Sequence, residues 1–155
     1  MDIEQIYHRQ VDSVYRVAMM YLKNQQDAED ATQTAFINLI KNPVEFESEA
    51  HEKAWLIVTV SNLCKNQLNH WYKKKRTDYE AIAPLLQTRD PESDQILEQV
   101  LNLPDDLKVI IYMYYYEGYS TREISRYLDL NESTLRSRMQ KARELLRIEW
   151  EDVHE

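Results

Sequence analysis

Only one glycine, Gly118, and four prolines occur in this chain of 155 residues. Sheet-rich folds need Gly, Asn and Asp at many tight turns, so this scarcity favours long helices with few breaks. Apolar residues also recur at the three- and four-residue spacing of a helix face, as Val14, Ala18 and Leu22 do near the N-terminus. We therefore predict an all-α fold.

The apolar pattern divides the chain into two small helical domains joined by a linker. A first domain at residues 1–76 is predicted to hold three helices, at about 3–22, 27–42 and 51–75. The linker at 77–91 has weak periodicity and contains two prolines. A second domain at residues 92–150 is predicted to hold four helices, at about 92–102, 105–117, 120–128 and 131–149.

The formal net charge of −8 argues superficially against nucleic-acid binding, but the basic residues are clustered. Residues 65–76 carry five Lys or Arg and no acid, and residues 133–147 carry five more against the lone Glu144. Clustered basic residues matter more than the sum of charges for nucleic-acid binding. Two basic stripes on an acidic chain therefore predict two nucleic-acid contacts.

Several other classes of protein are disfavoured by the composition. The single Cys64 forms no internal disulfide and no zinc site by itself, and the helical pattern around it predicts a small buried or half-buried hydrophobic residue. No apolar run approaches the roughly 20 residues that span a bilayer, and the N-terminus resembles no signal peptide. The four histidines are scattered, and no nucleophile has a recognisable setting. We expect a cytoplasmic protein that is not an enzyme and uses no metal or other cofactor.

The segment from about 105 to 147 reads as a helix-turn-helix. Gly118 stands where the preceding helix needs a left-handed C-terminal cap. Ser120 and Glu123 match a capping box at the start of the next helix, and Asn131 is placed to cap the one after it. Two short helices, a tight turn and a basic second helix are the arrangement that reads DNA.

The predicted second helix separates into two faces. Its apolar face consists of Leu135, Met139, Ala142 and Leu146. The other face carries Ser133, Arg136, Ser137, Gln140 and Lys141. An Arg or Gln side chain can form two hydrogen bonds with the edge of one purine, while Ser, Lys and Arg side chains bind phosphates. An ordinary surface helix with solvated charges is the alternative, and the capped turn with its uneven charge favours DNA.

Two sets of segments resemble a known family, the extracytoplasmic-function (ECF) sigma factors of bacterial RNA polymerase. Region 4 of that family is similar to Leu103–Leu107, Tyr116–Ile124, Ser133–Arg138 and Lys141–Arg143. Region 2 is similar to Asp27–Phe36, and to Ala54–Leu56 followed by Asn62 and the basic run. The resemblance implies a promoter-specificity subunit that binds core RNA polymerase and promoter DNA, with an anti-sigma factor as a further partner.

The resemblance also implies which residues do what. Region 2.2 would dock on the clamp helices of the polymerase β′ subunit through Asp27, Asp30, Gln33 and Phe36. Capture and melting of the −10 element would use Asn62, Lys65, Asn66, Asn69, Lys73 and Lys74. Recognition of the −35 element in the major groove would use Ser133, Thr134, Arg136, Ser137, Gln140 and Lys141.

Some of these roles have structural alternatives. The spacing places Asp30, Gln33 and Phe36 away from an alanine stripe, so that acid, amide and ring would be presented together. Asp27 also suits the positive end of the helix dipole. Trp55 is predicted to be a core residue. The tyrosines within 112–116 fit either packing against the polymerase β flap or core filling.

A second function remains as an alternative, that of an autonomous helix-turn-helix regulator that binds operators without polymerase. It leaves the region 2 resemblance unexplained. Asn66 and Asn69 stand where Asp and Arg are frequent in the family, so no −10 base preference is inferred. Asp129 occupies a turn position that glycine often holds.

Overall fold

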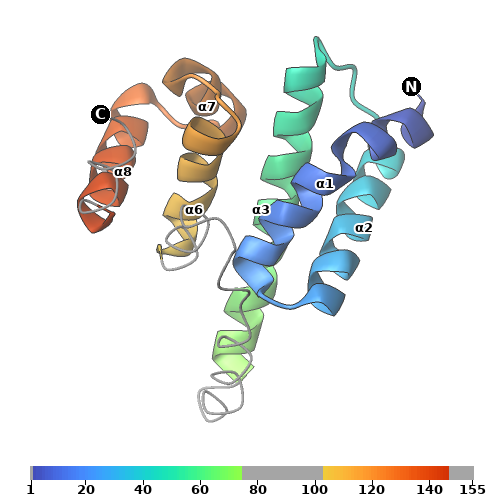
Figure 1. Cartoon of the computed structure of the whole chain (residues 1–155), viewed down its shortest axis with the longest axis horizontal. Coiled ribbons are helices and arrows are strands. Elements are labelled where there is room, and N and C mark those ends of the chain that lie inside the picture. Colours follow the sequence, from blue (N-terminus) through green and yellow to red (C-terminus); the bar gives the residue numbers. More distant parts are fainter. Residues whose placement is uncertain (1, 75–102, 147–155) are drawn as a thin grey trace. The chain divides into compact units, whose positions relative to one another are not determined.

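The computed structural model describes residues 2–74 and 103–146, and all regular secondary structure in these residues is helical (Figure 1). The predicted all-α fold is thus confirmed. The chain forms two compact units, Met1–Ser93 and Asp94–Glu155. The predicted helix at 92–102 and the linker at 77–91 lie outside the described residues. None of the described helices is both long and apolar enough to cross a membrane.

Three helices make up the described part of the first unit: α1 (Ile3–Leu22), α2 (Gln25–Lys41) and α3 (Glu49–Lys74). Each of them packs against the other two. The break between α1 and α2 is shorter than the sequence pattern predicted, because Lys23 adopts a left-handed φ of 60° and Asn24 caps α2 at once. The Asn24 side chain accepts a hydrogen bond from the Asp27 amide at 2.9 Å. As a result α2 begins two residues earlier than predicted.

The core of this unit contains the alanine stripe of α2, as predicted. The buried residues of that stripe are Ala28, Ala31, Ala35 and Leu39. Their counterparts on α3 include Leu56, Ile57, Val60 and Cys64. Small alanine side chains let the neighbouring helices approach closely, and larger residues from α1 and α3 fill the remaining space.

The prediction that Trp55 lies in the core is wrong. The Trp55 side chain is only partly buried, and its ring lies edge-on to Phe46 with centroids 6.1 Å apart. Ala54 and Leu56 on either side of it are fully buried. The indole therefore lies at the margin of the bundle, against the segment that connects α2 to α3.

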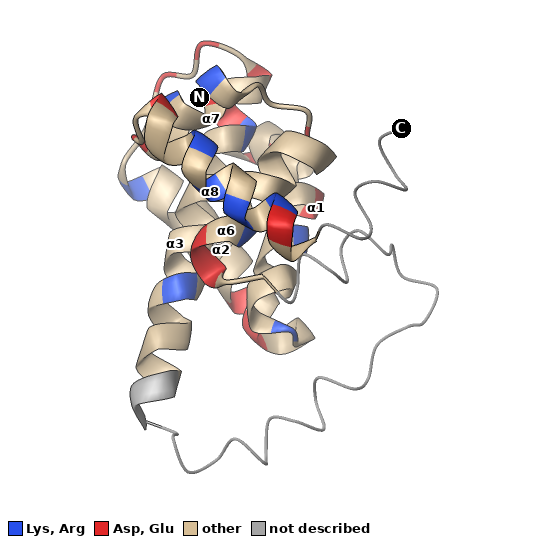
Figure 2. Ribbon diagram, turned by 90° about the vertical axis from the view of Figure 1, so that its left-hand side faces the viewer, with Lys and Arg blue, Asp and Glu red and all other residues tan. Residues whose placement is uncertain are grey.

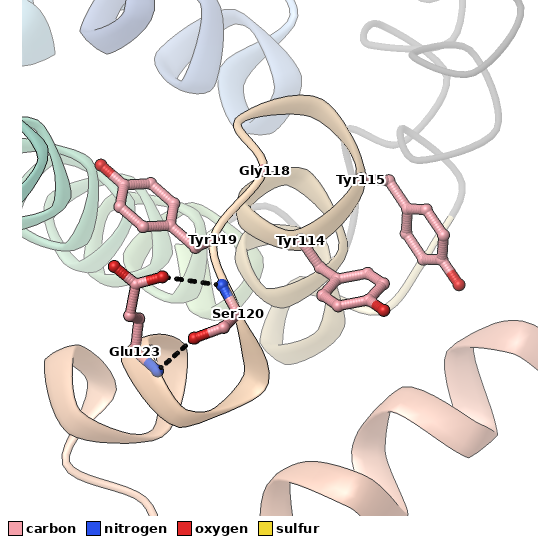
Figure 3. A pocket seen from close by; sticks show the side chains of 6 residues that line it. All are labelled: Tyr114, Tyr115, Gly118, Tyr119, Ser120 and Glu123. Carbon is pink, nitrogen blue, oxygen red and sulfur yellow. Dashed lines mark hydrogen bonds between the residues drawn. The ribbon is translucent and has the colours of Figure 1, made fainter.

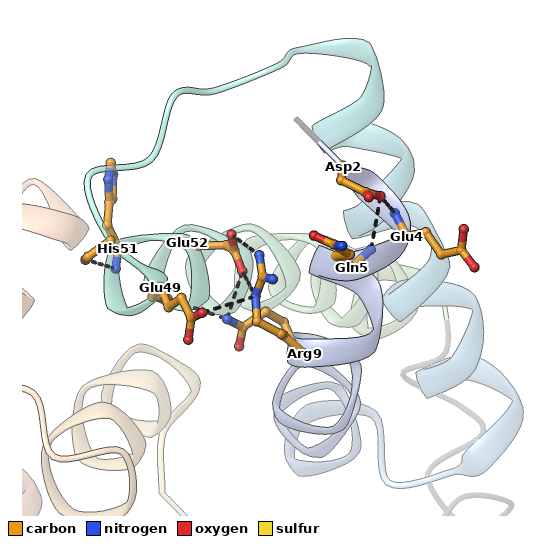
Figure 4. A network of polar contacts seen from close by, with 9 residues as sticks. Asp2, Glu4, Gln5, Arg9, Glu49, His51 and Glu52 are labelled. Carbon is orange, nitrogen blue, oxygen red and sulfur yellow. Dashed lines mark hydrogen bonds and ion pairs between the residues drawn. The ribbon is translucent and has the colours of Figure 1, made fainter.

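A polar network joins α1 to the start of α3 (Figure 4). Arg9 donates from Nε and Nη2 to the two carboxylate oxygens of Glu52, at 3.1 and 3.0 Å, and Gln10 donates to the same carboxylate at 3.0 Å. Glu52 is buried, so this paired geometry replaces the water that its charge would otherwise need. The hydrogen bond with Glu52 raises the pKa of Arg9 above its ordinary value. The network aligns the first turns of α3 with α1.

The second unit contains α6 (Asp105–Ile111), the π-helix η2 (Tyr112–Tyr116), α7 (Thr121–Leu128) and α8 (Glu132–Leu145). The sequence predicted one continuous α-helix over 105–117, and the structure corrects this. The Glu117 amide bonds to the Tyr112 carbonyl five residues back, at 3.1 Å. The Tyr112 hydroxyl donates to Glu117 across the same turn at 2.7 Å. The widened turn leaves Tyr112 and Met113 buried and leads into Gly118, which has the predicted left-handed φ of 81°.

Candidate nucleic-acid and polymerase interfaces

The helix-turn-helix of the second unit is capped as the sequence predicted. The Ser120 hydroxyl accepts from the Glu123 amide at 3.1 Å, and the Glu123 carboxylate accepts from the Ser120 amide at 3.0 Å. At the turn that follows, Asp129 has a left-handed φ of 56°, and Asn131 accepts from the Thr134 amide at 2.7 Å. These local bonds fix where α7 ends and α8 begins.

The two faces of α8 are those predicted. Leu135, Met139, Ala142 and Leu146 are buried against the rest of the unit. The side chains of Ser133, Arg136, Ser137, Gln140 and Lys141 are exposed, and Thr134 is partly buried. Lys and Arg are frequent along the α8 ribbon in Figure 2. A capped helix therefore presents a basic, hydrogen-bonding face while its apolar face holds it in place.

Two side chains of this exposed face already have partners within the described residues. The Arg136 guanidinium lies 3.7 Å from the Glu132 carboxylate, one turn away, and both side chains are mostly exposed. Exposed pairs of this kind contribute little, so a DNA phosphate or base can displace the glutamate. The Ser133 hydroxyl donates to the capping Asn131 at 2.8 Å and so belongs to the start of the helix.

On α3 four of the six predicted −10 residues fall on one helix face. Asn62, Asn66 and Asn69 are exposed and Lys65 is partly buried, while Val60, Ser61, Cys64 and Leu68 are buried. Lys73 and Lys74 also belong to α3, but their side chains lie outside the described part of the structure. The exposed face offers three carboxamides, which donate and accept hydrogen bonds.

An aromatic cluster at the start of α3 was not predicted. Phe46 lies edge-on to both His51 and Trp55, with centroids 5.3 and 6.1 Å away. His51 accepts a hydrogen bond from the Glu47 amide at 3.1 Å, which ties the connecting segment to the helix. The spacing of His51 and Trp55 by four residues was the available signal.

The predicted polymerase-binding residues of α2 do not share one face. Asp30 and Gln33 are exposed, as expected. Phe36 is 5% exposed, and its ring packs edge-on against Tyr7 of α1. The prediction that its ring is presented with Asp30 and Gln33 is therefore wrong. Asp27 is partly buried in the first turn of α2, where the helix dipole favours an acid, and it also pairs with the capping Asn24.

The apolar part of this exposed face was not predicted from the sequence. Ile37 is 45% exposed and Ile40 is 54% exposed. Together with Asp30 and Gln33 they recur at intervals of three and four residues, which places them in one stripe along α2. Exposed isoleucines beside an acid and an amide form a surface suited to a partner protein.

The second unit also has an open hollow of about 600 Å³ beside the turn that precedes α7 (Figure 3). Its lining consists of Tyr114, Tyr115, Gly118, Tyr119, Ser120 and Glu123. Burial, and to a smaller extent the charge of Glu117, raise the pKa of the Tyr119 phenol above its ordinary value. The lining of the hollow thus combines three tyrosines with the two residues of the capping box. Among the described residues no cluster of His, Cys, Asp or Glu is placed to hold a metal ion.

Two family models match successive parts of the chain. Family models of sigma-70 region 2 and sigma-70 region 4 match residues 6–77 and 93–146. ECF RNA polymerase sigma factor SigW of Bacillus subtilis is 28% identical over 98% of this chain and 89% of its own length. ECF RNA polymerase sigma factor SigM of Mycobacterium tuberculosis is 26% identical over 90% of this chain and 72% of its own length.

A solved structure agrees in fold. The sigma factor RpoE of Bartonella quintana, in a crystal with the anti-sigma factor NepR, superposes with a TM-score of 0.69 at 18% identity, over 94% of this chain and 96% of that one. Sigma factors are non-enzymatic RNA polymerase subunits that bind core polymerase and promoter DNA. The order of the two regions, their helical fold and these relatives agree, and the chain belongs to the ECF RNA polymerase sigma factors, with sigma-70 regions 2 and 4.

Proposed function

We propose that the three exposed faces described above divide promoter recognition between them. In this proposal α8 reads the −35 element, α3 captures the −10 element, and α2 docks on core polymerase. The proposed region boundaries are residues 1–76 for region 2 and 92–150 for region 4. The observation that carries the proposal is the capped α8, whose apolar face is buried while its Arg, Gln, Lys and Ser side chains are exposed.

For the −35 element, the exposed face of α8 has the chemistry of major-groove recognition. Arg136 and Gln140 are one turn apart, and both are exposed. Side chains of these two types can form two hydrogen bonds with the edge of one purine. Ser137 and Lys141 flank them, and Thr134 and Ser133 precede them at the helix N-terminus. Amides at a helix N-terminus and basic side chains both bind phosphates, which sets the position of the helix on the duplex.

For the −10 element, α3 would hold a base that leaves the stack. Flipping a base costs a few kcal/mol, which the site must return through hydrogen bonds, stacking and phosphate contacts. The carboxamides of Asn62, Asn66 and Asn69 offer donors and acceptors to base edges. Lys65, Lys73 and Lys74 supply the positive charge for the displaced strand.

For polymerase docking, the acidic and apolar stripe of α2 would meet the β′ clamp helices. Asp30 and Gln33 would make polar contacts, and Ile37 with Ile40 would bury apolar surface. Phe36 would support this stripe from beneath and Asp27 would stabilise the helix start. The tyrosine-lined hollow of the second unit would receive the β flap.

The proposal places the protein in the cytoplasm with core polymerase, and includes an anti-sigma factor as a regulator. The solved structure that shares this fold was determined with an anti-sigma factor bound. A partner that covers the exposed faces of α2 and α8 would keep the free protein from binding polymerase and DNA.

Run-off transcription with purified core polymerase tests the division of labour. Asp30→Ala is expected to weaken binding to core polymerase, whereas Asp12→Ala, which removes an exposed acid from α1, is expected to leave it unchanged. Arg136→Ala is expected to retain core binding and to lose discrimination at the −35 element. Operator binding by the free chain, with no transcription when core polymerase is added, would instead support the autonomous regulator.

A further inference from the structure

We propose that Arg143 is an additional DNA contact, held by Tyr114 and Tyr115 so that its guanidinium binds a phosphate at the C-terminal end of α8. The inference rests on the proposed binding of α8 to the −35 element. It adds a phosphate contact that contributes affinity without sequence preference, outside the set of residues assigned to base reading.

Two contacts from η2 hold the Arg143 side chain. Its Nε donates to the Tyr115 hydroxyl at 3.0 Å, and its guanidinium carbon lies 5.9 Å from the centroid of the Tyr114 ring. The two tyrosines are themselves packed edge to face, with centroids 4.7 Å apart and planes 84° apart. In Figure 3 both rings extend from the helix to the same side, away from Tyr119. The tyrosine pair thus forms a rigid support for one arginine.

The contacts with Tyr114 and Tyr115 leave the terminal nitrogens of the Arg143 guanidinium available. Arg143 is exposed, and within the described residues its only hydrogen bond uses Nε. Both terminal nitrogens of the guanidinium remain as donors, and two such donors match the oxygens of one phosphate. An arginine that is already ordered loses less side-chain entropy when it binds, so the support increases affinity.

The position of Arg143 on α8 suits a backbone contact. Arg136 and Arg143 are seven residues apart, two turns along the same edge of the helix. Recognition helices contact base edges with their N-terminal residues, and the C-terminal end of such a helix lies near the sugar–phosphate backbone. Arg136 is placed for bases and Arg143, two turns later, for phosphate.

A salt titration of DNA binding by the reconstituted holoenzyme tests the inference. The probes are a short fluorescent duplex pool of random sequence and a duplex that the wild-type holoenzyme selects from it. Arg143→Ala is expected to lower affinity for both by a similar factor, about 3- to 10-fold, and to reduce the slope of log affinity against log salt by about one. Arg143→Lys, which keeps the charge but not the planar fork, is expected to restore the slope and only part of the affinity.

The role of the tyrosine support is tested by a double-mutant cycle. Tyr115→Phe keeps the ring and removes the hydroxyl, and is expected to lower affinity for both probes about two- to threefold. The matched control is Tyr116→Phe, an exposed tyrosine of the same π-helix that stacks on Tyr112, and it is expected to have no effect. Adding Tyr115→Phe to Arg143→Ala is expected to change nothing further, because the hydroxyl acts through the arginine.

Unchanged affinity and salt slope in Arg143→Ala would overturn the inference. The hydrogen bond between Arg143 and Tyr115 would then only connect α8 to η2 at the surface of region 4. An effect of Tyr115→Phe that persists without Arg143 would overturn the positioning role. Failure of the −35 assignment is seen separately, as a wild-type holoenzyme that selects no duplex or an Arg136→Ala holoenzyme that discriminates normally. The effect of Arg143→Ala on affinity and salt slope is measured on the random pool, so it can be determined whether or not the −35 assignment holds.

Discussion

The ring of Phe36 lies edge-on to the ring of Tyr7, with centroids 4.9 Å apart, and this contact joins α2 to α1. Phe36 is 5% exposed as a result, while Tyr7 covers it and remains 41% exposed. The next residue, Ile37, points out of the bundle on the stripe shared with Asp30 and Gln33. Neighbouring residues of one helix therefore have different surroundings, because Phe36 is buried in the bundle and Ile37 belongs to the exposed stripe that we propose binds polymerase.

Phe36→Ala and Ile37→Ala are expected to separate these roles. Truncating the buried ring leaves a cavity between α1 and α2 and is expected to destabilise region 2 by about 3 to 5 kcal/mol. Truncating exposed Ile37 is expected to change stability by less than about 1 kcal/mol and to weaken core polymerase binding severalfold. Urea denaturation and a fluorescence binding assay with core polymerase measure the two effects. Equal loss of stability in both variants would contradict the assignment.

Gly118 and Asp129, the two left-handed positions described in the second unit, are expected to respond in opposite directions. Gly118 has a φ of 81° and space for a Cβ, so Gly118→Ala adds backbone strain without a steric clash and is expected to cost about 1 kcal/mol. Asp129 has a φ of 56°, so Asp129→Gly is expected to relieve strain and stabilise α7 and α8 by up to about 1 kcal/mol. Amide hydrogen exchange of α7 in the full chain reads out both. A change of the same sign in both variants would refute this explanation.

Ser120→Ala removes the hydroxyl that accepts from the Glu123 amide, and is expected to destabilise α7 by about 1 kcal/mol. Ser120→Asp supplies another acceptor at the same place and is expected to recover most of the loss. The measurement is thermal unfolding followed by circular dichroism. Thr121→Ala, at the exposed first residue of α7, serves as the control because its side chain is not part of the capping box.

Region 4 is expected to lose stability in alkali through Tyr119. Its pKa is raised in the folded state, so between the ordinary value near 10 and the raised value the folded phenol keeps a proton that the unfolded phenol has lost. The folded state then binds more protons, and stability falls as the pH rises through this range. Tyr119→Phe is expected to flatten the decline that begins near pH 10, measured as the urea midpoint at increasing pH. Tyr116→Phe, which changes an exposed tyrosine, is expected to leave the decline in stability unchanged.

Features that depend on neighbours in the sequence were predicted correctly. The left-handed Gly118, the capping box of Ser120 and Glu123, and the Asn131 cap are formed as expected. Each depends on bonds within four residues or on one residue's backbone freedom, so composition and spacing contain the needed information. The split faces of α8 followed from helical periodicity for the same reason.

Helical periodicity predicts burial less well for residues at the edge of a helix face. Phe36 lies at the border of the α2 stripe, where the pattern permits either burial or exposure, and the ring of Tyr7 from another helix decided in favour of burial. Trp55 was misplaced for the same reason, since its exposure depends on Phe46 and the segment before α3. The π-helix has no local signature, and the buried Tyr112 and Met113 show which packing it serves.

By itself, the sequence determined that the chain is helical, where its caps and turns lie, and which α8 side chains face away from the core, because these follow from bonds and spacings along one helix. Only the tertiary structure decided that Phe36 is buried and Ile37 exposed, and that two tyrosines of η2 hold Arg143 of α8. Those outcomes depend on which side chains of separate helices compete for the same space, and packing between helices resolves that competition.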